Sequence, residues 1–284
     1  MAESPAGISP TELIEALYRQ ILLRASDPEG LASKVEALAG GHASVEDIVA
    51  QFTKSSEFAE RVPELLNKAG TAHLQRFTND VSQFGEVWEL IRLWVNGSAA
   101  SRTVVDVGAR GLGRSNSYDL MRHFGWRGVL IEANPALLPE LQADFAGLDV
   151  SILGCAISDY EGSATLTLGV NEDVSSLNAA LAGSWGASPG TVEVQVRRLA
   201  DVLAEQAVPP VFDLLSVDIE GEDIKVLNDL IGLSAYRPEW IIIEASNDFA
   251  TQSLDDLPFS QAVKDAYALR AQTRANLILQ RRHP

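Results

Sequence analysis

The stretch TVVDVGARGLGRSNSYDLMRHFGWRGVLIEANP, which starts at Thr103, constrains the fold of this chain more than any other. Its first five residues are a short β-branched apolar run, which is typical of a buried strand. A glycine-rich segment follows, and Ser115 or Asn116 is expected to cap the next helix. A second apolar run, Gly128 to Ile131, ends in Glu132, and Asn134-Pro135 is expected to cap the helix that follows. The pattern predicts a β-α-β unit with a glycine-rich first turn and an acid at the tip of the second strand.

The first turn and the acid together indicate a ligand site. Glycines such as Gly108 let the backbone approach a ligand, and Glu132 can accept hydrogen bonds from both hydroxyls of a ribose. A dinucleotide site would show G-x-G-x-x-G, whereas Gly108, Gly111 and Gly113 miss that register. Asp106 would repel a pyrophosphate but suits the cationic methionine part of S-adenosylmethionine. The stretch alone predicts a nucleoside-cofactor site and leaves S-adenosylmethionine and other ligands open.

The composition excludes several classes of protein. The 284-residue chain has a net charge of −17, which argues against a nucleic-acid partner, because phosphate binding needs clustered Lys and Arg. The single cysteine, Cys155, excludes an intramolecular disulfide, and the four histidines lack the spacing of zinc ligands. No apolar run approaches the length of a membrane span, and the N-terminus lacks the apolar core of a signal peptide. We therefore expect a cytoplasmic protein.

Apolar residues at helical spacing precede the β-α-β unit. They predict a small all-α domain at residues 1–62, in which Asp27 and Ser44 cap the second and third helices. A helical bridge is expected at residues 63–99, and its His73 is interpreted as structural or solvated rather than catalytic.

Residues 100–284 are predicted to form a doubly wound, Rossmann-like α/β sheet that is mostly parallel. Further strands are expected at 149–153, 162–168, 192–196, 212–217 and 240–243, with a closing antiparallel hairpin at 267–273 and 276–281. Ligands of such sheets bind beyond the carboxyl ends of the strands. This places Cys155 and Ala156 where an adenine ring could lie, with Cys155 as an apolar lining rather than a nucleophile. The long loop at 169–190 is of a length that is usually functional or disordered.

Acidic residues cluster at the ends of two predicted strands. Asp218, Glu220 and Glu222 follow one strand, and Glu244 ends the next. Carboxylates this dense are costly in mutual repulsion unless a cation or a ligand uses them.

The order of these motifs resembles the FkbM family of S-adenosylmethionine-dependent methyltransferases over about residues 100–282. The matching parts of the first unit are Gly108-Ala109, Ser115-Asn116-Ser117-Tyr118, Gly125 to Gly128, and Ile131 to Pro135. The later motif L-S-x-D-x-E-G-x-E appears as Leu215 to Glu222, E-x-x-N as Glu244 to Asn247, and T-x-x-N-x-I-x-x-R as Thr273, Asn276, Ile278 and Arg281. One departure is that the first loop is a residue shorter than in the family, with Arg110 in place of an asparagine.

The resemblance implies O-methylation of a hydroxyl, commonly of a sugar in a glycan, glycolipid or secondary metabolite. The implied cofactor contacts are Asp106, Gly108, Ala109, Ser115, Asn116, Glu132, Ala133, Cys155 and Ala156. Asp218, Glu220 and Glu244 are the candidates for a base that removes the hydroxyl proton. They are expected to act without a metal, because Asp218 and Glu220 point in opposite directions if the strand continues. The alternatives are that the acids hold magnesium or calcium, and that Glu222 merely caps the following helix.

The first 62 residues carry a second resemblance. The motif L-Y-R-x-I-L-x-R-x-x-D-P-x-G-L resembles that of a bacterial domain of unknown function related to phycobilisome-linker repeats. Such domains often accompany surface-glycan enzymes, so the helical head is expected either to bind a partner protein or glycan, or only to pack on the catalytic domain. Two other functions stay open, a protein or lipid O-methyltransferase and a non-catalytic scaffold, although the intact acids favour an enzyme. The sequence sets neither the acceptor nor the oligomeric state.

Overall fold

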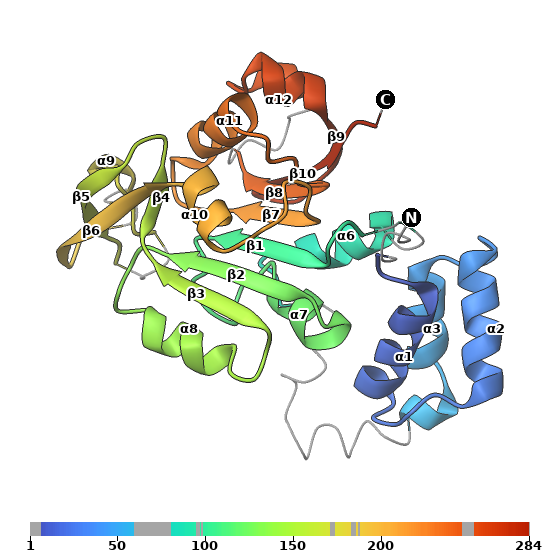
Figure 1. The fold of residues 1–284 in the computed structure, drawn as a ribbon. Helices are drawn as coiled ribbons and strands as arrows, with labels where there is room; N and C mark the ends of the chain where they lie inside the picture. Colours follow the sequence, from blue (N-terminus) through green and yellow to red (C-terminus); the bar gives the residue numbers. More distant parts are fainter. Residues whose placement is uncertain are drawn as a thin grey trace.

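The computed structural model describes residues 7–59, 81–94, 97, 99–170, 174–182, 186, 188–245 and 253–283. Figure 1 shows a small group of helices near the N-terminus beside a larger α/β unit. The predicted fold class, a Rossmann-like sheet preceded by a small all-α part, is confirmed. The domain boundaries at residues 62 and 99 stay predictions, and His73 and Asn247 lie outside the described residues.

The described part of the head includes three helices and a further helical turn that begins at residue 56. The three helices are α1 (Pro10–Ile21), α2 (Pro28–Ala39) and α3 (Val45–Thr53). Each begins where a short polar side chain, of Ser9, Asp27 or Ser44, accepts a hydrogen bond from a backbone amide of the first turn. The caps predicted at Asp27 and Ser44 are therefore confirmed. Inside the head, the rings of Tyr18 and Phe52 meet edge to face, with their centroids 4.8 Å apart.

The larger unit is built on a seven-stranded sheet in the order β3-β2-β1-β7-β8-β10-β9. Its strands are β1 (Thr103–Val107), β2 (Arg127–Glu132), β3 (Val150–Gly154), β7 (Leu214–Val217), β8 (Trp240–Glu244), β9 (Tyr267–Gln272) and β10 (Asn276–Arg281). The first five are parallel, and β10 pairs antiparallel with β8 and β9. The predicted closing hairpin is thus confirmed. Strand order reverses between β1 and β7, which is where ligands of such sheets bind.

Helices cover both faces of this sheet. One face carries α6 (Glu86–Trp94), α7 (Tyr118–Phe124) and α8 (Leu138–Asp144), and the other carries α10 (Leu199–Glu205), α11 (Asp223–Leu233) and α12 (Gln261–Ala266). Side chains of the central strands alternate between the two cores, with Val104 and Leu214 in the first and Val105 and Leu215 in the second. Because both faces are covered, these strands are continuous apolar runs rather than alternating ones.

A second sheet, β4-β6-β5, extends from the end of β3. It contains β4 (Ala156–Ser158), β5 (Gly162–Leu168) and β6 (Gly190–Arg198), with β5 and β6 antiparallel as their alternation predicts. The predicted loop between them carries a short helix, α9 (Ala179–Ala182), and is anchored by paired backbone hydrogen bonds between Thr167 and Ser176. A 3₁₀ turn, η1 (Leu254–Asp256), precedes α12. The sequence did not predict β4, α10 or α12, which are all short.

Two helix starts differ from expectation. Helix α7 begins at Tyr118 with Ser117, not the predicted Ser115 or Asn116, at its N-cap position. The Ser115 hydroxyl still accepts the backbone N–H of Tyr118 at 3.0 Å, while Asn116 donates to Ser216 at 3.1 Å. The cap predicted at Asn134 is wrong. Its side chain closes a turn by accepting the Ala136 N–H at 3.0 Å, and α8 starts only at Leu138.

The head packs beside α6 and α7, at the end of the sheet opposite the strand tips. Arg102, just before β1, donates to the Glu12 carboxylate at 2.8 Å, and Gln20 hydrogen-bonds the His123 ring at 3.1 Å. Apolar residues of the head, α6 and the sheet form one continuous core. No helix among the described residues is both long and apolar enough to cross a membrane.

Candidate active site

The glycine turn after β1 joins the ends of three strands. Gly108 has a φ of +88°, and a Cβ atom there would lie 1.8 Å from the backbone oxygen of Asp218. Only glycine fits this close approach. The backbone amides of Gly108 and Ala109 both donate to the Ile131 carbonyl, and the Asp218 amide donates to Val107. These bonds bring the tips of β1, β2 and β7 together.

Two adjoining cavities open over these tips. Cavity A includes Gly108, Glu132, Ala133, Cys155, Ala156, Asp218 and Glu220 in its lining. Cavity B has a volume of about 620 Å³ and includes Asp106, Gly108, Ala109, Ser115, Asn116, Asp218, Glu220 and Glu244. The two share Gly108, Arg110, Asp218 and Glu220, so they form one cleft. Every site residue predicted from the sequence lines this cleft, while the role of each stays a prediction.

Glu132 lies in cavity A at the end of β2. Its carboxylate accepts the backbone N–H of Asn134 at 2.6 Å. Burial raises the pKa of Glu132 to about 7, while the amides of Asn134 and Ala133 and the charge of Arg110 oppose the rise. The carboxylate is therefore held in place by its own turn and titrates near neutral pH.

Apolar groups line the remainder of cavity A. Cys155 and Ala156 follow β3 and are buried, and Ile157 lies beside them. Burial raises the pKa of the Cys155 thiol, which therefore stays protonated at neutral pH. This environment agrees with the prediction that Cys155 is a lining group rather than a nucleophile. Ser175 and Leu177 of the segment after β5 complete the wall.

A buried polar network forms one side of cavity B. The Ser117 hydroxyl donates to the Asp106 carboxylate at 2.6 Å, and burial raises the pKa of Asp106. Asn116 donates to Ser216, which leaves its Oδ1 atom buried without a hydrogen-bond partner among the described residues. An acceptor in this position calls for a donor from a ligand or water.

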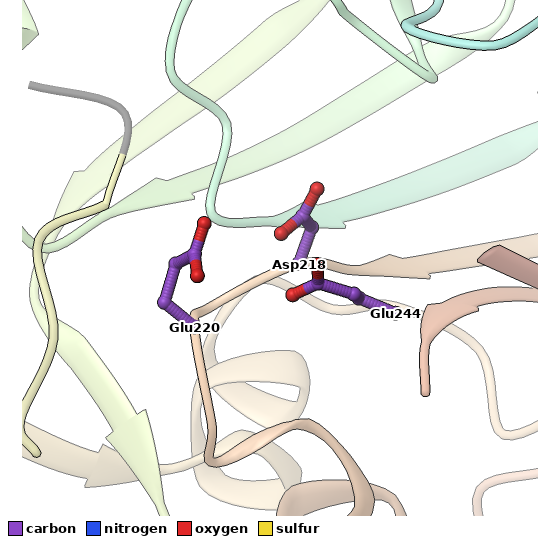
Figure 2. Close-up of side chains that lie close together, drawn as sticks. All are labelled: Asp218, Glu220 and Glu244. Atoms are coloured by element: carbon purple, nitrogen blue, oxygen red, sulfur yellow. The ribbon is translucent and has the colours of Figure 1, made fainter. Parts of the chain in front are cut away.

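Three carboxylates converge where cavities A and B meet. One oxygen from each of Asp218, Glu220 and Glu244 lies within 4.8 Å of the others, and Figure 2 shows the three side chains directed toward a common space. The prediction that Asp218 and Glu220 point in opposite directions is wrong. Strand β7 ends at Val217, and Glu220 then adopts a left-handed φ of +56°, which turns its side chain back toward Asp218.

Asp223 holds this turn in shape. Its carboxylate accepts the backbone N–H of Ile219 at 2.8 Å and that of Gly221 at 2.9 Å. The Ser176 hydroxyl donates to the Glu220 carbonyl at 2.7 Å from the segment after β5. Two bonds from one side chain and a third from another segment stabilise the left-handed residue, whose conformation is otherwise unfavourable. The helix cap considered for Glu222 is wrong, because its carboxylate instead accepts from Ser158 and Lys225.

Mutual repulsion and burial change the protonation of the acids. Burial, followed by the charges of Glu244 and Asp223, raises the pKa of Asp218 well above its usual range. Burial and the charge of Glu220 raise the pKa of Glu244 to about 7, and a hydrogen bond with Asp218 opposes this rise. Asp218 and Glu244 therefore titrate as a pair, and the pKa of each carboxyl is raised.

The sequence did not predict Arg274 at cavity B or the buried Glu86 that supports its turn. Arg274 lines the cavity from the turn between β9 and β10. Glu86 of α6 is fully buried beneath that turn and accepts from Thr273 at 2.6 Å and from Asn276 at 3.0 Å. Thr273 and Asn276 belong to the closing motif recognised in the sequence. That motif was the one feature of the sequence that could have indicated a site role for Arg274.

The mostly parallel sheet, its glycine turn after β1 and the acid at the tip of β2 define a Rossmann-like fold of the methyltransferase type. The family model of the Methyltransferase FkbM domain matches residues 106–261. The chain therefore belongs to the FkbM methyltransferase family and is a methyltransferase. The model of DUF4214, a domain of unknown function, matches residues 3–62. Both resemblances seen in the sequence are confirmed, and no curated protein or solved structure matches the chain.

Proposed function

We propose that this methyltransferase transfers the methyl group of S-adenosylmethionine to a hydroxyl of a small molecule or glycan. The favoured acceptor is a sugar hydroxyl of a glycan, glycolipid or secondary metabolite, and the favoured location is the bacterial cytoplasm. The observation that carries the proposal is the convergence of Asp218, Glu220 and Glu244 beside the Gly108 turn, where cavity A and cavity B meet.

The cleft fits S-adenosylmethionine in its chemistry. Glu132 offers an acceptor for the ribose hydroxyls, and Cys155 and Ala156 offer an apolar wall for adenine. In cavity B, the buried Asn116 Oδ1 atom and the Asp106 carboxylate are acceptors suited to the ammonium group of the methionine part. Together these residues would hold the cofactor across β2 and β1, with its reactive end toward Asp218.

S-adenosylmethionine supplies an electrophilic methyl group on a positively charged sulfur. The acids then have a simple task, because the acceptor oxygen loses its proton as it forms the new bond to carbon, and the bond from carbon to sulfur breaks. Asp218 and Glu244 are placed to accept that proton. Burial raises the pKa of both carboxyls, to which the charge of Glu244 adds at Asp218 and the charge of Glu220 adds at Glu244. The walls of the cleft add the larger contribution by orienting the acceptor oxygen and excluding water.

A divalent cation is the second candidate for the acid cluster. The grouping of three carboxylate oxygens within 4.8 Å of one another supports it, since magnesium and calcium prefer oxygen ligands. A bound cation would lower the pKa of the acceptor hydroxyl and offset the repulsion among the acids.

The test is a screen for methyl incorporation from radiolabelled S-adenosylmethionine into glycans, nucleotide sugars and lipids of the source cell. Methylation at a sugar oxygen that is lost in the Asp218→Asn protein is the expected result. Incorporation only into protein or lipid headgroups would overturn the sugar assignment and support the related alternatives. The head is proposed to pack or to bind a partner rather than to hold the cofactor, since no described residue from 7 to 59 lines cavity A or B.

A further inference from the structure

We propose that the methyl acceptor carries an anionic group, a carboxylate or a phosphate, and that Arg274 binds it. The proposal rests on the function above and names the substrate class of the same cleft. Arg274 is then a specificity-determining residue that binds the part of the acceptor remote from the reacting hydroxyl.

The order of the strands in the sheet sets the order of the residues along the cleft. Along the tips of the strands, Glu132 ends β2, Gly108 follows β1, Asp218 follows β7, and Glu244 ends β8. The next strand is β10, and its turn carries Arg274. A cofactor held over β2 and β1 brings its methyl group to the acids, so the acceptor extends from there toward β10.

The turn that bears Arg274 lies on the strand next to Glu244. Glu244 is the register partner of Asn276, so the turn that bears Arg274 starts about one strand spacing, about 5 Å, from the acid cluster. The Arg274 side chain lines the same cavity as Asp218, Glu220 and Glu244. A hydroxyl at the acids and an anionic substituent at Arg274 can therefore belong to the same ring or to adjacent groups.

Arg274 is held in position before any acceptor binds. Buried Glu86 accepts hydrogen bonds from Thr273 and Asn276, which flank the turn, and from the Phe84 amide at 2.8 Å. The Arg274 guanidinium then lies over the Phe84 ring, 5.6 Å from its centroid. One carboxylate thus fixes both the turn and the ring on which the guanidinium lies. Preorganisation of this kind strengthens binding by reducing the ordering cost.

The charge of the site also favours an anion at this end. No described carboxylate forms an ion pair with Arg274, although the chain has 39 acidic residues against 22 basic ones. Arg110 and Arg114 line cavity B as well, so three arginines line one cavity in a protein of net charge −17. A planar guanidinium pairs well with carboxylates and phosphates through two parallel hydrogen bonds.

Two alternative interpretations of the arginines and acids of the cleft have less support. The carboxylate of the cofactor is a possible target for an arginine, but Arg110 lies at the glycine turn between the two cavities, whereas Arg274 lies beyond the acids on the far side. A neighbouring cavity near α11 contains Glu220 and Glu244 but not Asp218, and its only basic lining residue is Lys225 among those described. Among cavity A, cavity B and the cavity near α11, as lined by described residues, only cavity B combines all three acids with Arg274.

The experiment measures binding of matched sugars to the full-length protein saturated with S-adenosylhomocysteine. The probes are methyl glycosides of glucose, galactose and mannose, the corresponding uronic acid glycosides, and the corresponding sugar 1-phosphates, titrated by calorimetry. At least one anionic sugar should bind about tenfold or more tightly than its neutral counterpart, the scale of a charge-assisted hydrogen bond. The uronate and phosphate arms distinguish the two anions.

Arg274→Gln should abolish the preference for the anionic sugar, Arg274→Lys should restore part of it, and binding of neutral sugars should not change. Arg270→Gln is the matched control, because Arg270 is exposed on β9, lies outside the cleft lining and carries the same charge. The proposal is overturned if no anionic sugar binds more tightly than its neutral counterpart, or if Arg270→Gln has the same effect. It is also overturned if Arg274→Gln weakens S-adenosylmethionine binding to the same extent. Absence of S-adenosylmethionine binding to the unaltered protein would instead contradict the proposed function.

Discussion

The Glu132→Gln substitution tests the ribose contact, because it keeps the shape of the side chain and removes its charge. Burial raises the pKa of Glu132 to about 7. The ionised form accepts hydrogen bonds from the ribose hydroxyls, so S-adenosylmethionine should bind more tightly as the pH rises. With this pKa, the ionised fraction grows from about one tenth at pH 6 to about nine tenths at pH 8.

The expected sizes follow from this titration. If the ionised form alone binds the ribose, affinity rises about tenfold between pH 6 and pH 8. Losing the charge-assisted hydrogen bonds costs about 2 kcal/mol, or about 30-fold in affinity. Glu132→Gln should therefore bind S-adenosylmethionine about 30-fold more weakly at pH 8 but only about threefold more weakly at pH 6.

Isothermal titration calorimetry at pH 6, 7 and 8 measures both profiles. Glu140→Gln is the control, because Glu140 is exposed in the first turn of α8 and lies outside the cleft lining. Other acids of the cleft titrate in both proteins, so the difference between the profiles reports Glu132. Parallel pH profiles for the unaltered and Glu132→Gln proteins would refute the ribose contact. Binding of NAD without binding of S-adenosylmethionine would refute the cofactor assignment.

Four further predictions concern the strand tips. Asp218→Asn should lower turnover by about 100-fold or more, the scale of losing a positioned base, and leave S-adenosylmethionine affinity nearly unchanged. The Glu220→Gln protein tests the neighbouring acid in the same way. Unaltered turnover in both variants would show that these acids are structural. Removal of divalent ions with a chelator should not change turnover if the acids act as a base, whereas a loss that magnesium restores would establish the cation mechanism. Burial raises the pKa of Glu244 to about 7 from an ordinary 4.5, so the stability it contributes is present below pH 4.5 and is lost as the pH rises through 7. Glu244→Gln should therefore raise the free energy of unfolding at pH 8 by about 1–3 kcal/mol and not at pH 4, as denaturant titration can check; an equal gain at both pH values would contradict the pKa shift. Gly108→Ala should lower the free energy of unfolding by about 2–5 kcal/mol because of its positive φ and the clash with Asp218, and a melting temperature within one degree of the original would contradict the close approach.

Much of the fold follows from local patterns in the sequence. Buried β-branched runs, glycines at turns and short polar caps such as Asp27 and Ser44 act through neighbouring residues, so they can be recognised without tertiary structure. Short elements such as β4 and α10 were missed, because three to seven residues carry too little periodicity. The Asn134 cap was misplaced for a related reason, since its side chain bonds a turn two residues ahead and the same residue type serves both purposes.

The candidate site was likewise predicted in part from the sequence and in part only from the tertiary structure. The sequence identified which residues gather at the strand tips, because the carboxyl ends of parallel strands lie on one edge of the sheet. It could not show that Glu220 turns back toward Asp218, since that depends on a left-handed backbone held by Asp223 and by Ser176, which is 44 residues away. Only the tertiary structure placed Arg274 at the same cavity, through a buried carboxylate, Glu86, that is 187 residues from its partner Thr273. Local propensity acts over a few residues, whereas hydrogen bonds between distant segments form only when the sheet brings them together.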